Sequence, residues 1–310
     1  MKVAVLGSGA MGSLYGGALA EIGCEVVLID VWKDHVDAIN KLGLTIKEPD
    51  GEKTIRGARA VLTASDAGVA DLVIVFVKAT ATEEAMRGAL SLIGEKTTVL
   101  TLQNGMGNVE KLCNVVPALQ VIAGTTGHGA TLLGPGKILH AGVGNTVIGE
   151  LDGSCTERIE VISSFLEKAG MSAKISVNVL GLIWTKLIVN VGINALTAVT
   201  GLKNGRLNDF SEAEALMKGA IEEAFTVAKC KGITLETDEP FEYTRNIAKK
   251  TAGNRSSMLQ DILAKRPTEI AAINGAVVAE GKKLGIPTPV NSLLTSLVLI
   301  RQQTYEEAFQ

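Results

Sequence analysis

Three polar side chains recur at one-turn spacing within a long apolar segment in the second half of the chain. Lys186, Asn190 and Asn194 are four residues apart, so a helix would place all three on one face. Burying an unpaired amide costs about 1–3 kcal/mol, and an unpaired ammonium costs more. We therefore expect this face to border a polar ligand or a wet cleft. A solvated helix face is the alternative, although such a face normally carries several charges and this one carries a single lysine.

A glycine-rich segment near the N-terminus has the spacing of a phosphate-binding loop. The dinucleotide-binding fingerprint G-x-G-x-x-G is matched by Gly7, Ser8, Gly9, Ala10, Met11 and Gly12. The match directly follows an apolar run and precedes a helical pattern. Gly7 would allow the tight turn, Gly9 the approach of a pyrophosphate, and Gly12 the packing of helix on strand. The phosphates would then lie at the N-terminus of a helix, where free N–H groups favour an anion. A glycine-rich turn without a ligand is the alternative.

The residue that ends the second apolar run bears on the choice of cofactor. Asp30 follows residues 25–29, where a carboxylate would bind the ribose hydroxyls of adenosine and repel a 2′-phosphate. Taken alone, Asp30 favours NAD(H) over NADP(H). Lys33 could reverse this preference by pairing with the phosphate, although a solvated surface lysine is the alternative.

Two further loops follow predicted strands, at the edge of the sheet where ligands bind in open parallel folds. Lys78 follows residues 72–77, and Asn104 lies in a Gln-Asn-Gly-Met-Gly segment that follows residues 98–102. An amide at the mouth of a strand can reach both the nicotinamide ribose and a substrate. The alternative for Asn104 is an ordinary turn residue.

Several polar residues in the last third of the chain have both a structural and a functional interpretation. Ser256 or Ser257 could be the N-cap of a helix, and Asp261 lies one turn beyond Ser257. Glu269 stands in the first turn of a predicted helix, where an acid interacts favourably with the helix dipole. Composition alone does not separate these roles from binding or catalysis.

The first half of the chain must supply a sheet that positions the glycine loop. Short, nearly continuous apolar runs alternate with helical patterns, which predicts a mostly parallel, doubly wound α/β sheet covered on both faces. Strands are predicted at residues 2–6, 25–29, 60–62, 72–77, 98–102, 121–123, 137–140, 146–148 and 173–175, with a helix over 157–169.

The second half must supply the helix that carries Lys186, Asn190 and Asn194, which we call the polar stripe. Helical patterns cover residues 180–199, 211–231, a stretch after 239, 256–265, 268–284 and 290–307. We therefore predict a dinucleotide-binding domain over residues 1–177 and an all-α substrate-binding and catalytic domain over residues 178–310.

Composition argues against several other classes of protein. The net charge of −3 and the 4% aromatic content do not suggest a nucleic-acid-binding surface. The histidines at 35, 128 and 140 share no ligand spacing, so no metal site is expected. No cysteine pair forms a Cys-x-x-Cys motif and no signal peptide is evident, so we expect reduced thiols in a cytoplasmic protein. The apolar stretch 179–199 contains Lys186 and two asparagines, which favours a buried helix over a membrane span.

The motifs together resemble those of a known family, the ketopantoate reductases (2-dehydropantoate 2-reductases). The resembling segments run in the expected order through nearly the whole chain: GSGAMG at 7–12, QNGMG at 103–107, KLIVNVGINALTAV at 186–199, NG at 204–205, and NRSSMLQDI with TEIAAINGAVV within 254–278. The later, longer motifs are much more specific than the glycine loop.

The resemblance implies a Rossmann domain followed by a helical domain like that of 6-phosphogluconate dehydrogenase, with the substrate between them. It implies that Lys186 donates a proton to the ketone oxygen, with Glu269 as a second catalytic residue and Asp261 as a support for Ser257. The implied substrate-binding residues are Asn104, Lys186, Asn190, Asn194, Asn204 and Ser257. The implied cofactor-binding residues outside the glycine loop are Asp30, Lys78, Asn104, Ala130 and Glu269.

The implied activity is the reduction of ketopantoate to pantoate by NAD(P)H, in pantothenate and coenzyme A biosynthesis. NADP(H) is the usual cofactor of the family, but its NADPH-using members often have an arginine where this chain has Asp30, so NAD(H) is a close alternative. A reductase of another branched 2-oxo acid or of an imine is a second interpretation. A non-catalytic NAD(P)-binding sensor is a third. The expected partner is a small 2-oxo acid, with a homodimer possible and no nucleic acid or membrane involved.

Overall fold

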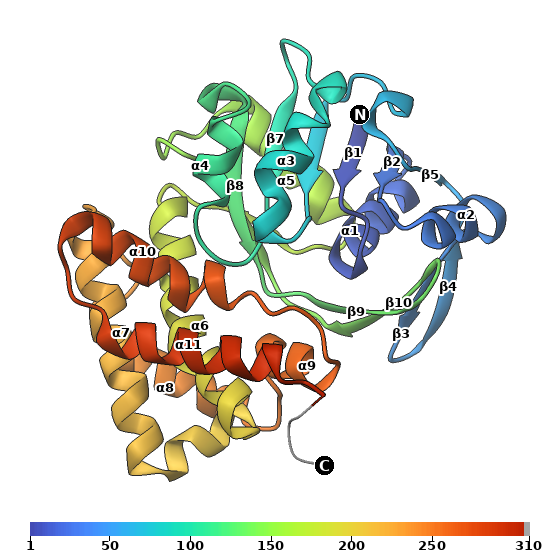
Figure 1. Ribbon diagram of the computed structural model, residues 1–310. Coiled ribbons are helices and arrows are strands. Elements are labelled where there is room, and N and C mark those ends of the chain that lie inside the picture. Colours follow the sequence, from blue (N-terminus) through green and yellow to red (C-terminus); the bar gives the residue numbers. More distant parts are fainter. Residues whose placement is uncertain (307–310) are drawn as a thin grey trace. The chain divides into compact units, whose positions relative to one another are not determined.

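A computed structural model describes residues 1–306 of the protein. The chain forms two compact units (Figure 1). One contains residues 1–103 and 108–179, and the other contains residues 104–107 and the chain from Leu180 onward. The first is an α/β unit and the second is helical, so the predicted fold class is confirmed.

A large sheet forms the centre of the first unit. Its strands are β1 (Lys2–Leu6), β2 (Glu25–Ile29), β5 (Ala58–Val61), β6 (Leu72–Val75), β7 (Thr98–Thr101), β8 (Val121–Thr126), β11 (Thr146–Glu150) and β12 (Ala173–Ile175). They lie in the order β12–β11–β8–β7–β6–β1–β2–β5. Within the described chain, β8 and β11 form the one antiparallel pair of this sheet. The prediction of a mostly parallel sheet is therefore confirmed.

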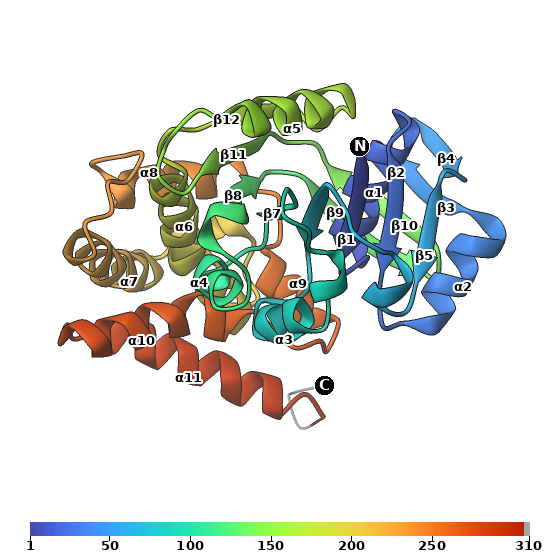
Figure 2. The same ribbon diagram turned by 90° about the horizontal axis from the view of Figure 1, so that it is seen from above.

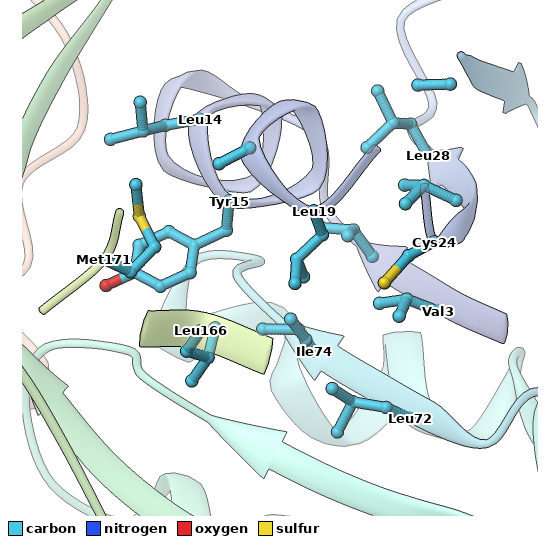
Figure 3. Close-up of a cluster of buried hydrophobic side chains, with 14 of the residues drawn as sticks. Val3, Leu14, Tyr15, Leu19, Cys24, Leu28, Leu72, Ile74, Leu166 and Met171 are labelled. Atoms are coloured by element: carbon cyan, nitrogen blue, oxygen red, sulfur yellow. The ribbon is translucent and has the colours of Figure 1, made fainter. Parts of the chain in front are cut away.

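Other elements cover both faces of this sheet. Successive side chains of each strand point to opposite faces, so each strand contributes to two clusters of buried residues. Val3 and Val5 of β1 pack on the face covered by α1 (Ala10–Glu21) and α5 (Glu157–Lys168). Figure 3 shows this cluster, in which Tyr15 and other α1 side chains gather above the strands. Ala4 and Leu6 pack on the opposite face. That face is covered by the short helices α3 (Thr82–Arg87) and α4 (Asn108–Cys113), and Figure 2 shows α5 and α3 on opposite sides of the strands.

A second, smaller sheet covers the glycine-loop helix from its other side. It contains β3 (Leu44–Glu48), β4 (Gly51–Ile55), β9 (Gly129–Gly134) and β10 (Lys137–Gly142), in the order β4–β3–β10–β9. A Cβ atom on Gly17 of α1 would lie 3.0 Å from side chains of β3 and β4, so glycine allows the close approach. The strand at 137–140 was predicted, whereas β3, β4 and β9 were not. Helix α2 (Lys33–Leu42) precedes β3.

The second unit is a helical bundle built around α6. Its helices are α6 (Val179–Thr200), α7 (Ser211–Cys230), α8 (Pro240–Lys250), α9 (Ser257–Leu263), α10 (Asn274–Leu284) and α11 (Pro289–Gln303), with short 3₁₀ segments η5 (Asn204–Asp209) and η6 (Ile270–Ala272). Among the described helices, α6 alone is long and apolar enough to cross a membrane, but 67% of that stretch is buried inside the chain. It therefore packs as the core helix of a bundle does.

Two helix predictions need correction or limitation. The continuous helix predicted over 268–284 is wrong, because the chain bends at Ile273 (φ −107°, ψ −95°) between η6 and α10. The helix predicted over 290–307 is present as α11, and residue 307 lies outside the described part of the chain.

Candidate cofactor-binding and catalytic sites

The three fingerprint glycines have three different structural reasons to be glycine. Gly7 has a φ of +91°, and a Cβ there would lie 2.7 Å from the backbone nitrogen of Val77. A Cβ on Gly12 would lie 2.0 Å from the carbonyl oxygen of Gly7. A Cβ on Gly9, by contrast, would meet no protein atom within 4 Å. Gly7 and Gly12 are thus required by the fold itself, whereas the space above Gly9 is open to a ligand.

The N-terminus of α1 is suited to an anion. Gly9 is its N-cap, no side chain caps it, and its first turn carries no acidic residue. The first backbone N–H groups of a helix lack intrahelical partners and carry partial positive charge. The glycine loop therefore fits the pyrophosphate of a dinucleotide.

A buried hydrogen-bonded chain fixes the shape of the glycine loop. Ser13 Oγ donates to the carbonyl oxygen of Ser8 at 2.6 Å, and His35 Nε2 lies 3.3 Å from Ser13 Oγ. The Gly136 N–H donates to His35 Nδ1 at 3.0 Å, so the Nε2 atom carries the hydrogen and the ring is neutral. Burial lowers the pKa of His35, which agrees with this state. No feature of the sequence had indicated that His35 and Ser13 support the loop.

Asp30 lies at the carboxyl end of β2, where the sequence predicted it. Its Oδ1 atom accepts the N–H of Trp32 at 3.0 Å, and its Oδ2 atom accepts from Ser8 Oγ at 3.4 Å. The carboxylate is therefore held against the glycine loop. Lys33 forms an ion pair with Asp37 at 2.5 Å, which raises the pKa of the lysine, and its side chain is 70% exposed.

The other two cofactor candidates of the first unit lie in different surroundings. Lys78 is exposed and precedes the 3₁₀ segment η2 (Ala79–Ala81). Ala130 lies in β9 opposite His140 of β10 and is partly buried. The sequence did not predict the strand that holds Ala130.

The polar stripe lies along α6 as predicted. Asn194 is 5% exposed, while Lys186 and Asn190 are partly buried. Burial lowers the pKa of Lys186 from 10.5 to about 8, and the opposing charge of Glu269 moderates this effect by raising it. A lysine with a pKa near 8 is mostly protonated at neutral pH yet can release its proton readily, which suits a general acid.

The loop that contains Asn104 packs against the segment that follows Glu269. The N–H of Met106 donates to the carbonyl oxygen of Ala272 at 2.9 Å, and a Cβ on Gly105 would lie 2.7 Å from the same oxygen. Gly105 also has a φ of +82°. Glu269 is the N-cap residue directly before η6. Asn104, Glu269 and Lys186 all belong to the helical unit. The sequence offered only the two glycines of the loop as a sign of this contact.

Asn204 is buried with half of its amide satisfied. Its Nδ2 atom donates to Thr251 Oγ1 at 3.0 Å, and its backbone N–H donates to the carbonyl oxygen of Asn254. Its Oδ1 atom is buried without a hydrogen-bond partner among the described residues. A buried, unsatisfied acceptor costs about 1–3 kcal/mol, so this oxygen would gain from a hydrogen-bond donor if the side chain turned to meet one.

The two serines at the start of α9 have separate roles. Ser256 Oγ accepts the N–H of Leu259 and lies 2.7 Å from Thr197 Oγ1 of α6, so Ser256 is both the N-cap of α9 and a contact with α6. Ser257 is exposed in the first turn. Asp261 binds the Arg266 guanidinium through Nε at 3.0 Å, a partner that the sequence did not suggest.

Comparison with known proteins places this chain in a family. The sequence model of the family "Ketopantoate reductase PanE/ApbA" matches residues 3–153, and the sequence model of the family's C-terminal domain matches residues 178–302. A 2-dehydropantoate 2-reductase of Halobacterium salinarum is 36% identical over 98% of this chain and 99% of the relative, and one of Pyrococcus horikoshii is 34% identical over 97% and 98%. This chain belongs to the ketopantoate reductase family.

Two solved structures are similar to nearly the whole chain. The ketopantoate reductase of Ralstonia eutropha is 35% identical with a TM-score of 0.91, over 99% of this chain and 100% of that one. D-mandelate dehydrogenase, in a complex with NADH and anilino(oxo)acetate, is 32% identical with a TM-score of 0.91 and the same coverage. The ketopantoate reductase fold thus also serves a dehydrogenase with a different named substrate.

The residues singled out by the resemblance to ketopantoate reductases divide between the two units. The α/β unit holds the glycine loop, Asp30, Lys78 and Ala130, and the helical unit holds Asn104, Lys186, Asn190, Asn194, Asn204, Ser257 and Glu269. Among the described residues, no group of three or more His, Cys, Asp or Glu side chains could hold a metal ion.

Proposed function

We propose that this chain is a 2-dehydropantoate 2-reductase that reduces ketopantoate to pantoate with a nicotinamide dinucleotide. The observation that carries the proposal is Lys186, whose ammonium group has a pKa of about 8, lowered by burial and raised in part by the charge of Glu269; it is the one charged residue of the mostly apolar helix α6. The relatives named as 2-dehydropantoate 2-reductases support it, because they match this chain over nearly its full length.

The glycine loop supports the dinucleotide assignment, because a side chain at Gly9 would fill open space and the helix that follows is uncapped. When bound, the reduced nicotinamide supplies the hydride that adds to the ketone carbon. NADP(H) is the usual cofactor of the family. The position of Asp30, and the engagement of Lys33 by Asp37, lead us to propose that NADH serves at least as well.

The side chains of the helical unit account for the remaining steps. We assign to Lys186 the proton that neutralises the alkoxide formed on the ketone oxygen. Glu269 keeps the lysine protonated by opposing its charge. Asn190, Asn194 and Ser257 would hold the 2-oxo acid without adding charge, and Asn104 would contact both cofactor and substrate.

Asn204 bears on which 2-oxo acid fits. Ketopantoate carries a primary hydroxyl group on the carbon next to its quaternary carbon. That hydroxyl would satisfy the unpaired Oδ1 atom of Asn204 once the buried amide turned toward the ligand. 3,3-Dimethyl-2-oxobutanoate has the same branching but no hydroxyl. We expect kcat/KM for this analogue to be about 5- to 150-fold lower, the equivalent of leaving one buried polar group unsatisfied.

The test is the consumption of NADH or NADPH, followed by absorbance at the reduced-nicotinamide band, with and without ketopantoate. Lys186→Ala should lower kcat by about 10²–10⁴. Lys203→Ala, which changes an exposed lysine of the same unit, is the matched control and should leave kcat unchanged. If Lys186 only bound the substrate carboxylate, its loss would raise KM and preserve kcat at saturation.

A second candidate is a reductase of another branched 2-oxo acid or an imine, and the similarity to D-mandelate dehydrogenase favours it. The kcat/KM values for ketopantoate, 3,3-dimethyl-2-oxobutanoate and benzoylformate would distinguish the two kinds of reductase. Oxidation of the nicotinamide that depends on any of these substrates excludes the third interpretation, a non-catalytic sensor. We further propose a cytoplasmic location, and the homodimer stays a prediction.

A further inference from the structure

An exposed indole lies directly beside the carboxylate that ends β2. Trp32 is 37% exposed, and its ring stacks on the ring of His35 with centroids 5.5 Å apart and planes 8° from parallel. His35 itself is 1% exposed. Because the imidazole is covered, the exposed part of the pair belongs to the indole.

Contacts with three separate segments hold the stacked Trp32 and His35 in place. His35 is held by the Gly136 N–H in the turn between β9 and β10 and by Ser13 of α1. The Trp32 N–H donates to Asp30 Oδ1, which fixes the backbone of Trp32 at the end of β2. An aromatic surface that is already immobilised loses little conformational entropy when a ligand stacks on it.

The position of the indole matches the order of groups along a dinucleotide. The glycine loop would hold the pyrophosphate, and Asp30, tied to that loop through Ser8 Oγ, would hold the adenosine ribose. The base is attached to the ribose on the side away from the phosphates, so it extends from Asp30 to residues that follow it. Of these, Val31 is 93% exposed and aliphatic, while Trp32 presents an aromatic ring.

We propose that Trp32 is the stacking platform for the adenine base of the cofactor, with His35 as the residue that positions it. The proposal rests on the proposed function, because it assigns a residue of the same dinucleotide site. The alternative is a purely structural role, in which the indole only shields His35 from water.

Three variants separate the two roles. Trp32→Phe keeps an aromatic face, Trp32→Leu keeps an apolar cover over His35 without an aromatic face, and Val31→Ala changes the exposed neighbour as a matched control. The probe is ADP-ribose, which contains the adenine, its ribose and the pyrophosphate but no nicotinamide. Its affinity is measured by isothermal titration calorimetry.

A stacking role predicts that Trp32→Leu weakens ADP-ribose binding by about 5- to 150-fold, that Trp32→Phe restores most of it, and that Val31→Ala has no effect. The kcat at saturating cofactor should stay within about twofold, because the nicotinamide end is unchanged. ADP-ribose should also quench indole fluorescence in the wild type and not in Trp32→Phe, whose remaining tryptophan is the buried Trp184.

Equal ADP-ribose affinity in folded Trp32→Leu and wild-type protein would overturn the platform. So would a wild type that binds NADH but not ADP-ribose, or one that binds NADPH but neither ADP-ribose nor its 2′-phosphate. If the wild type binds none of these ligands, the dinucleotide site and the proposed function fail together, which is a different result from failure of the platform alone.

Discussion

The lowered pKa of Lys186 predicts a specific loss of activity at alkaline pH. A general acid works only in its protonated form, and burial lowers the pKa of this ammonium from 10.5 to about 8. Because kcat/KM reports ionisations of the free enzyme, the basic limb of its pH profile should fall near pH 8.

The size of the effect follows from the two pKa values. With a pKa of about 8, Lys186 is about nine-tenths protonated at pH 7 and about one-tenth protonated at pH 9. The kcat/KM for ketopantoate reduction should therefore fall about tenfold over this range, and then about tenfold for each further pH unit. A lysine at the ordinary value of 10.5 would lose only about 3% of its protonated form at pH 9.

The assay is initial-rate oxidation of NADH or NADPH at low ketopantoate concentration from pH 6 to 10, with circular dichroism to confirm that the protein stays folded. In Lys186→Arg the guanidinium stays protonated throughout, so the limb should disappear although the rate is lower. In Glu269→Gln the limb should move to lower pH, because the charge of Glu269 raises the pKa of Lys186. A wild-type profile that is flat to pH 9.5, or an unchanged limb in Lys186→Arg, would refute the assignment.

Four further predictions follow from the structure. Gly9→Val should abolish dinucleotide binding without changing Tm, because the new Cβ meets no protein atom. Gly12→Val should instead destabilise the fold, because its Cβ would lie 2.0 Å from a backbone oxygen. Calorimetric titration measures binding and thermal melting measures stability, and normal binding by Gly9→Val contradicts the loop assignment. Asp30→Asn should raise the ratio of kcat/KM for NADPH over NADH, and a ratio that stays flat or falls means that Asp30 does not contact the ribose. Asn204→Ala should raise KM for ketopantoate about 3- to 10-fold with kcat within a few-fold, and an unchanged KM places the substrate elsewhere. Burial lowers the pKa of His35 in the folded state, so as the pH falls below about 6.5 this histidine is protonated in the unfolded chain before it is protonated in the folded one. The free energy of unfolding should therefore decline below this pH. Scanning calorimetry should show a smaller decline in His35→Asn, and an equal decline argues against this linkage.

The strands of the large sheet were predictable because they are buried on both faces. The bounds of β1 and β2, which are almost fully buried, match the predicted ranges residue for residue, and so do those of the partly exposed β12. The hairpin of β3 and β4 was missed, since it has several charged side chains and lacks the continuous apolar run of the buried strands. Pro49 and Asp50 form its turn and Gly51 begins β4, so a cluster of turn-forming residues was the sequence signal for this hairpin.

The bend between η6 and α10 could not be predicted in the same way, because its causes are distant in sequence. The carbonyl oxygen of Ala272 accepts from Met106. The amide of Asn274 donates to the carbonyl oxygen of Val191 and to Asn291 Oδ1. The helical periodicity across the bend is correct locally, and tertiary hydrogen bonds override it.

Polar residues of α6 show which part of the site the sequence could reveal. Thr185 and Thr197 donate to the carbonyl oxygens of Gly181 and Ile193, one turn earlier, so their hydroxyl groups are satisfied within the helix. An ammonium group has three donors and an amide has both donors and an acceptor, more than one backbone carbonyl can satisfy. In an apolar helix, threonine is therefore compatible with a closed core. Lys186, Asn190 and Asn194 instead require a polar environment beside the helix, which a bound 2-oxo acid would supply. This is why spacing alone located the stripe, while the pKa of Lys186 and the unpaired oxygen of Asn204 depended on burial by residues far away in the sequence.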